Sequence, residues 1–223
     1  MDPLAAYYAG RAAEYELVYA KPERQGDLAH LRERVCGLLA GCRVLEIACG
    51  TGWWTEVIAS EAAEVTAIDL SDEMLAIARG KLYPQGRVTF MRGDCHALPQ
   101  FGRRHDALLG AFWWSHVPRA RLDAFLAGAE QAIAAGGLLL FIDNRYVEGS
   151  STPVARRDAE GDTYQLRSLA DGSMHEVLKN FPEAEELRAR AGQRGTCVRI
   201  EQTDYYWLLC YRSRSTASEA AAL

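Results

Sequence analysis

The sequence predicts an α/β fold built on a mostly parallel sheet, and three observations support this. First, strand-like and helix-like segments alternate with short loops between residues 43 and 143. Second, an apolar run ends at the glycine-rich turn of V-L-E-I-A-C-G-T-G-W-W, residues 44–54. Third, residues 138–143 are apolar enough to be covered on both faces, as strands of parallel sheets are. The 223 residues suffice for one such domain, which we expect to span residues 1–223.

Two helices are expected before the sheet. Residues 4–19 are rich in alanine, leucine and glutamate, which favour a helix, and Pro22 ends this segment. An amphipathic helix follows at residues 27–39. We expect residues 1–40 to form an N-terminal helical cap on the domain.

The central part, residues 41–145, carries the alternation that defines the sheet and is expected to bind a cofactor. Ser71 is a typical N-cap, and Asp72 and Glu73 follow it in the first helical turn, where the helix dipole favours acids. Pro118 opens a long helix. The expected elements are, in order, strand 43–48, helix 53–60, strand 64–70, a helix from residue 71, strand 87–92, strand 105–112, helix 118–134 and strand 138–143.

The alternation breaks after the fifth strand. Residues 146–182 lack a helical period and predict an insert that covers the substrate, with a β-hairpin turning near Asp171-Gly172. In residues 183–212 we expect a last helix and a tightly joined strand pair, so that the last strand of a seven-stranded sheet is antiparallel. Residues 213–223 are small and polar and predict a flexible tail.

Composition and charge narrow the functional classes. A net charge of −5 disfavours nucleic acid as a partner. The six cysteines are scattered, without metal-ligand spacing, which is typical of reduced thiols. We see no signal peptide and no apolar run of membrane-spanning length. We therefore expect a cytoplasmic monomer or homodimer with a small-molecule substrate, no membrane partner and no bound metal.

The glycine-rich loop predicts the class of cofactor. Gly50 and Gly52 permit a tight turn and close approach of a ligand, and Asp69 ends the next strand, where its carboxylate can accept hydrogen bonds from a ribose. This arrangement suits NAD and other adenosyl cofactors equally. Trp53 and Trp54 crowd the helix start that a pyrophosphate needs, and no G-K-S/T follows the loop. An adenosyl cofactor without phosphate fits best.

Three motifs in order carry a resemblance to a known family. E-I-A-C-G-T-G, A-I-D-L-S-D-E-M-L-A-I-A and R-G-D-C-H-A-L-P resemble the class I S-adenosylmethionine-dependent methyltransferases, across roughly residues 7–143 and the terminal strand pair. The resemblance implies a Rossmann-like three-layer sandwich and S-adenosylmethionine as the cofactor. The start Y-Y-x-x-R-A-x-E-Y and the stretch W-x-x-H-V-P further resemble a small-molecule subgroup, some members of which methylate small acids, including phosphonates.

Carried over residue by residue, the resemblance implies a cofactor site. It assigns Ala48, Gly50 and Gly52 to the methionine part, Asp69 to the ribose, Leu70, Met74, Asp94 and the Cys95 amide to the adenine, Ala111 and Phe112 to the region of the reacting methyl, and Arg11 to the cofactor's carboxylate. Ala48 stands where many relatives have glycine, and an extra methyl group there is easily accommodated.

Candidate substrate residues follow from their positions. Tyr15 shares a helix face with Arg11, although an aromatic stripe that only packs on the domain gives the same pattern. Trp113 and Trp114 follow the fourth strand and are candidates for a substrate wall or for the core. His116, just before Pro118, is a candidate general base, or a residue that caps the helix or contacts the cofactor.

Arg167 and Lys179 in the insert are candidates for an anion site, and the hairpin register decides their role. A two-residue turn at Asp171-Gly172 places Arg167 opposite Glu176 and Lys179 on the other face. A three-residue loop over residues 170–172 places Arg167 and Lys179 on one face, where both can bind one anion.

These observations predict a methyltransferase that acts on a small molecule. The favoured reaction is O-methylation of a small carboxylic or phosphonic acid, because such an oxygen is a nucleophile at pH 7 without a strong base. One alternative is an N- or phenol-O-methyltransferase with His116 as base. An alternative of another class is a non-catalytic sensor or partner subunit that binds S-adenosylmethionine.

Overall fold

The computed structural model describes residues 7–8, 10–99, 101–102 and 105–214, and its centre is a seven-stranded sheet. The strands are β1 (Arg43–Ile47), β2 (Glu64–Asp69), β3 (Val88–Arg92), β4 (Ala107–Ala111), β5 (Leu138–Asn144), β9 (Gly195–Gln202) and β10 (Tyr206–Ser213). Their order is β3-β2-β1-β4-β5-β10-β9, and β10 runs antiparallel to both of its neighbours. The predicted sheet with an antiparallel last strand is confirmed.

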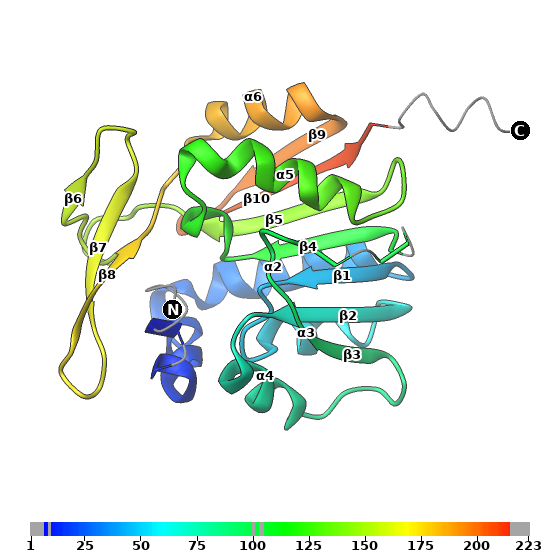
Figure 1. Ribbon diagram of the computed structural model, residues 1–223, viewed down its shortest axis with the longest axis horizontal. Helices are drawn as coiled ribbons and strands as arrows, with labels where there is room; N and C mark the ends of the chain where they lie inside the picture. Colours follow the sequence, from blue (N-terminus) through cyan, green and yellow to red (C-terminus); the bar gives the residue numbers. More distant parts are fainter. Residues whose placement is uncertain (1–6, 9, 100, 103–104, 215–223) are drawn as a thin grey trace, which may run out of the picture.

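Helices cover both faces of this sheet, which gives three layers (Figure 1). On one face lie α2 (Gln25–Leu39), α3 (Trp53–Ile58) and α4 (Asp72–Arg79); on the other lie α5 (Leu122–Gln131) and α6 (Ala184–Arg194). Burial on both faces explains the continuous apolar strands: in β1, Val44 packs into one core cluster and Leu45 into the other. The short 3₁₀ turns η3 (Trp114–His116) and η4 (Arg119–Arg121) precede α5, so the helix expected from Pro118 begins with a 3₁₀ turn.

The N-terminal segment differs from the expected α-helix over residues 4–19. Residues 7, 8, 10 and 11 are helical, but Ala12–Tyr19 forms a 3₁₀-helix, η1, which is long for this type. The Tyr19 ring stacks on Trp53, with centroids 4.2 Å apart and planes 12° from parallel. We infer that packing on the sheet domain overrides the α-helical propensity here. Residues 1–6 and 9 of the expected helical cap lie outside the described residues. So do residues 215–223 of the expected tail.

The insert forms a second, three-stranded sheet of β6 (Arg156–Arg157), β7 (Thr163–Ser168) and β8 (Met174–Leu178). It projects beyond the end of β5, beside the N-terminal segment (Figure 1). Leu169 N donates to Ser173 O at 3.0 Å, which leaves residues 170–172 as a three-residue loop. Arg167 therefore lies opposite His175 and shares a face with Lys179, as the second of the two registers requires. The short strand β6 escaped prediction. Within the described residues, no helix has the length and apolarity needed to cross a membrane.

Candidate active site

Two cavities meet beyond the carboxyl ends of the parallel strands. The larger, of about 370 Å³, lies between the N-terminal segment and the insert, and the smaller lies over the glycine-rich loop. Tyr8, Tyr15, Phe112 and His116 border both cavities. These four side chains therefore mark the junction between the two.

The glycine-rich loop shapes the smaller cavity through its backbone. Ala48, Gly50 and Gly52 all have positive φ, at 49°, 56° and 77°. Glycine is required most at position 52, because a Cβ there would come within 2.6 Å of the Tyr83 hydroxyl oxygen. Ala48 adopts the left-handed conformation despite its methyl group, so the alanine is accommodated at a small conformational cost.

Asp69 organises this loop from the end of β2. One carboxylate oxygen accepts from Gly50 N at 2.8 Å and the other from Ser71 N at 2.9 Å. Burial raises the pKa of Asp69, and the backbone donors Ser71 and Gly50 oppose that rise. Beside it, the apolar Leu70 is 41% exposed and borders the cavity. An acceptor for hydroxyl groups next to an uncovered apolar wall fits the ribose and adenine of an adenosyl cofactor.

Most of the predicted cofactor residues come together here. Those that line the smaller cavity are Ala48, Gly50, Asp69, Leu70, Met74, Ala111 and Phe112. Arg11 lines the larger cavity instead, beside Tyr15. Gly52, Asp94 and Cys95 are absent from the described lining of both cavities, and Asp94 accepts from His96 N at 2.8 Å within its own turn. The cofactor roles of all eleven residues stay predictions, and the cavity lining brings together the seven named first.

Replacement of Asp69 by asparagine is expected to weaken binding of S-adenosylhomocysteine by about 30- to 100-fold. The amide group of asparagine would direct an N–H group at the N–H of Gly50 or Ser71, and it would offer fewer acceptors to the ribose. Together these effects cost about 2–3 kcal/mol of binding free energy. Titration calorimetry measures the change. Asp72→Asn is the matched control, since the Asp72 side chain is 68% exposed in the next helical turn. Equal affinities of the two variants would contradict the role of Asp69.

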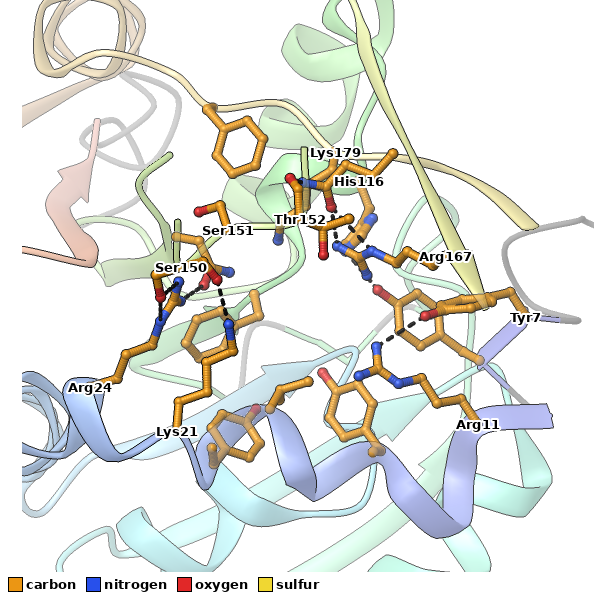
Figure 2. A pocket seen from close by; sticks show the side chains of 18 of the residues that line it. Tyr7, Arg11, Lys21, Arg24, His116, Ser150, Ser151, Thr152, Arg167 and Lys179 are labelled. Atoms are coloured by element: carbon orange, nitrogen blue, oxygen red, sulfur yellow. Dashed lines mark hydrogen bonds between the residues drawn. The ribbon is translucent and has the colours of Figure 1, made fainter. Parts of the chain in front are cut away.

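The larger cavity is lined by positive charge. Among its described lining residues are five cations, Arg11, Lys21, Arg24, Arg167 and Lys179, and no aspartate or glutamate. Figure 2 shows Lys21 and Arg24 on one side of this cavity, with Arg11 and Arg167 on the other. Tyrosines and hydroxyl side chains supply most of the remaining polar groups. The cavity is therefore suited to an anion.

Arg167 and Lys179 both reach this cavity from the inner face of the hairpin, but their charges are balanced differently. The Arg167 guanidinium donates to the amide oxygen of Gln165 at 3.1 and 2.6 Å, a neutral partner. The Lys179 ammonium lies 2.8 Å from Asp143 Oδ1 and 2.6 Å from Ser115 Oγ. The charge of Lys179 is therefore balanced by Asp143. Of the two cations, Arg167 is the one whose charge has no acidic partner among the described residues.

His116 is buried at the junction, and both of its ring nitrogens have protein partners. Nδ1 lies 2.6 Å from the Leu178 carbonyl oxygen, which can only accept, so Nδ1 carries the proton. Nε2 then accepts from the Tyr8 hydroxyl at 2.7 Å. Burial, and after it the nearby charge of Lys179, lowers the pKa of His116 well below its usual range. The neutral ring holds the Tyr8 phenol in place at the junction.

Trp113 and Trp114 were both candidates for a substrate wall, and for Trp114 the structure corrects this prediction. Trp114 is 2% exposed and packs edge-on against Phe141 and Trp207 in the core. The 3₁₀ turn η3 begins at Trp114, which turns this ring into the sheet domain, whereas Trp113 lines the smaller cavity. Tyr15 lines both cavities.

Several lining residues escaped the sequence analysis. Tyr8 belongs to the quoted Y-Y motif, but nothing in the sequence pairs it with His116. Lys21 and Arg24 flank Pro22, which was interpreted only as the end of a helix. The two cations on either side of Pro22 were the feature of the sequence that could have pointed to this part of the cavity.

Comparisons with known proteins agree with this geometry. A family described as a methyltransferase domain matches residues 44–137. The chain is 35% identical to a demethylmenaquinone methyltransferase of Tropheryma whipplei, over 50% of this chain and 47% of that protein. It is 34% identical to a ubiquinone biosynthesis O-methyltransferase of Aromatoleum aromaticum, over 70% and 64%. The chain thus spans about half to two thirds of the length of these curated relatives.

A solved structure matches over nearly its whole length. The DhpI-SAM-HEP complex has a TM-score of 0.76 and 30% identity, and the match covers 94% of this chain and 96% of that one. A second structure of DhpI, with SAH, gives the same TM-score at 29% identity. The sheet, the glycine-rich loop with Asp69 and these matches lead to one conclusion: the chain belongs to the class I S-adenosylmethionine-dependent methyltransferases.

Proposed function

We propose that the chain O-methylates a small carboxylic or phosphonic acid. The observation that carries this proposal is the larger cavity, whose described lining holds five cations and no carboxylate. Among the ion pairs of the described residues, only Lys179 of these five has a partner. A cavity of about 370 Å³ suits a small molecule rather than a polymer. The complex of DhpI with SAM and HEP, the nearly full-length match above, supports a small second ligand beside the cofactor.

The residues at the junction can position such an acid without a base. S-adenosylmethionine held in the smaller cavity would supply an electrophilic methyl group for the acid's oxygen and a neutral thioether as the leaving group, so that no base would be needed. Burial raises the pKa of Tyr15 to about 12, and also raises that of Tyr8, so both phenols stay neutral. The Tyr8 hydroxyl donates to His116 Nε2, which leaves the Tyr15 hydroxyl as the phenol that can donate to an anion. Phe112 and the rings of Tyr8 and Tyr15 border the junction, where their apolar surface would limit the access of water to the reacting groups.

The alternative with His116 as base ranks second. A phenol or an amine substrate requires a free nitrogen, whereas Nδ1 and Nε2 of His116 are bonded to Leu178 O and the Tyr8 hydroxyl. The test includes phenols because two relatives are named as methyltransferases of menaquinone and ubiquinone biosynthesis. This alternative requires Tyr8 to leave Nε2 before the substrate binds.

The test is methyl transfer from labelled S-adenosylmethionine to a panel of carboxylic acids, phosphonic acids, phenols and amines. We expect label in the acids, as base-labile methyl esters of the carboxylic acids and as base-stable monomethyl esters of the phosphonic acids. Label confined to phenols or amines would overturn the proposal in favour of the base-dependent reaction. Tight cofactor binding with no labelled product in the panel or in a metabolite extract would favour a non-catalytic binding protein.

A further inference from the structure

Lys21 and Arg24 form a separate cationic group in the larger cavity, on the side away from Arg167 (Figure 2). Arg24 is only 5% exposed, and its guanidinium donates to Asn144 Oδ1 at 3.0 Å and to Ser150 Oγ at 2.9 and 3.1 Å. The Lys21 ammonium donates to the carbonyl oxygen of Ser150. All these partners are neutral.

The charge of this group is not balanced by an ion pair. Glu23 is the nearby acid, but it is exposed and accepts from Ser150 Oγ at 2.8 Å, and it forms no ion pair with either cation among the described residues. Stacking of Arg24 near the rings of Tyr205 and Tyr206, 5.0 and 5.5 Å from their centroids, offsets only part of the cost of burial. The pKa of Lys21 is lowered, first by desolvation and then by the charge of Arg24. An anion placed between the two side chains would relieve this repulsion.

The same side of the cavity offers further hydrogen-bond donors. Ser151 lines it from the start of the insert, next to Ser150, whereas Thr152 lies farther toward Arg167 (Figure 2). Hydroxyl groups beside two cations are a typical environment for a carboxylate or a phosphonate. Arg167 lines the same cavity beside Tyr8, which borders the junction, and is the anion site of the proposed function for the reacting end.

We propose that the substrate carries two anionic groups and that Lys21 and Arg24 bind the one that is not methylated. This rests on the proposed function and names its substrate class: a small diacid, held at one end by Lys21 and Arg24 and at the reacting end by Arg167. Methylation neutralises a carboxylate, or lowers the charge of a phosphonate, at the reacting end alone. The product therefore keeps its anchor at Lys21 and Arg24, while its ion pair with Arg167 is lost for a carboxylate and weakened for a phosphonate, which favours release of the methylated end.

The test compares acids of matched chain length: pentanoic with pentanedioic acid, and propylphosphonic with 3-phosphonopropionic acid. Methyl transfer gives kcat/KM, and calorimetry with the S-adenosylhomocysteine-loaded protein gives the affinity. We expect the diacids to exceed the monoacids by about 10- to 100-fold in both measurements. Lys21→Met/Arg24→Gln should reduce this advantage to about one, because it lowers kcat/KM and affinity for the diacids by about 10- to 100-fold more than for the monoacids. The exposed pair Arg157→Gln/Arg188→Gln changes the net charge equally and should keep the advantage.

Two milder variants guard against misfolding of the double variant. Lys21→Met alone should lose part of the advantage, and Arg24→Lys should retain most of it. The inference is overturned if diacids match monoacids in the wild-type protein, or if the variant reduces both acids equally, as it would if these cations only held the insert. If diacids bind selectively but no acid is methylated, the second anion site stands and the proposed reaction fails. If no acid binds or is methylated, both fail.

Discussion

Replacement of Lys179 by methionine is expected to lower the free energy of unfolding by about 3–5 kcal/mol, because it leaves a buried carboxylate without its counterion. Asp143 is 0% exposed, and Lys179 Nζ lies 2.8 Å from its Oδ1. Its remaining donors are the backbone N–H groups of Ser115 and Asn144 and the Asn144 amide, which do not replace a positive charge. Denaturant unfolding measures the loss.

The variants of this pair also predict a pH dependence. Burial opposes ionisation of Asp143, but the charge of Lys179 and the hydrogen bonds from Lys179 and Ser115 N together hold the pKa of Asp143 below its usual value. Without Lys179, burial dominates and the folded-state pKa rises above that of the unfolded chain. Since such a group stabilises the fold at low pH, the deficit of Lys179→Met should shrink as the pH falls from 8 to 5.

The controls separate the buried pair from surface charge. Lys179→Met/Asp143→Asn removes both charges and should recover part of the lost stability. Arg156→Met breaks the exposed ion pair with Glu176 on the same small sheet and should cost about 1 kcal/mol or less. A loss for Lys179→Met as small as that for Arg156→Met would contradict the assigned role of the buried pair.

The parts of the site that were predictable are those set by local sequence. A strand that ends in a glycine-rich loop predicts both the turn at Gly50 and Gly52 and the position of Asp69. In the structure, Gly50 and Asp69 lie together as expected. Positive φ and short strand-to-loop spacing depend on a few neighbouring residues. The sheet was predictable for a related reason, because apolar strands alternate with helices.

The parts that were not predictable depend on contacts between distant segments. The sequence around Asp171-Gly172 is compatible with a two-residue and a three-residue hairpin loop. We infer that packing of the hairpin's inner face against the sheet domain selects the three-residue loop. The partner of Lys179 is Asp143, on a strand of the other sheet, and no spacing rule pairs them. Trp113 and Trp114 are adjacent and chemically alike, yet the turn at η3 sends one to a cavity and one to the core. In each case tertiary packing decided between alternatives that were locally equivalent.

Replacement of Arg167 by methionine is expected to lower kcat/KM for an acid substrate by about 100-fold or more. Among the described residues, the guanidinium contacts neutral groups, namely Gln165 by hydrogen bond and the neighbouring Tyr7 and Tyr8, so its charge is available to the substrate. Two charge-assisted hydrogen bonds to an acid contribute about 3–4 kcal/mol in a site shielded from water. Affinity for S-adenosylhomocysteine should change little, because Arg167 does not line the smaller cavity.

Arg156 provides the matched comparison, because it lies on the same hairpin sheet but is exposed and already paired with Glu176. Arg156→Gln should leave kcat/KM unchanged, and Arg167→Lys should recover part of the activity as a point charge without the planar fork of the guanidinium. The phenols and amines of the substrate panel carry no negative charge and should be insensitive to Arg167→Met, since the lost interaction is with an anion. If Arg167→Met methylated acids at the wild-type rate, the anion would bind elsewhere in the cavity. If it slowed neutral substrates equally, Arg167 would act by holding Tyr7 and Tyr8 in place rather than by binding the acid.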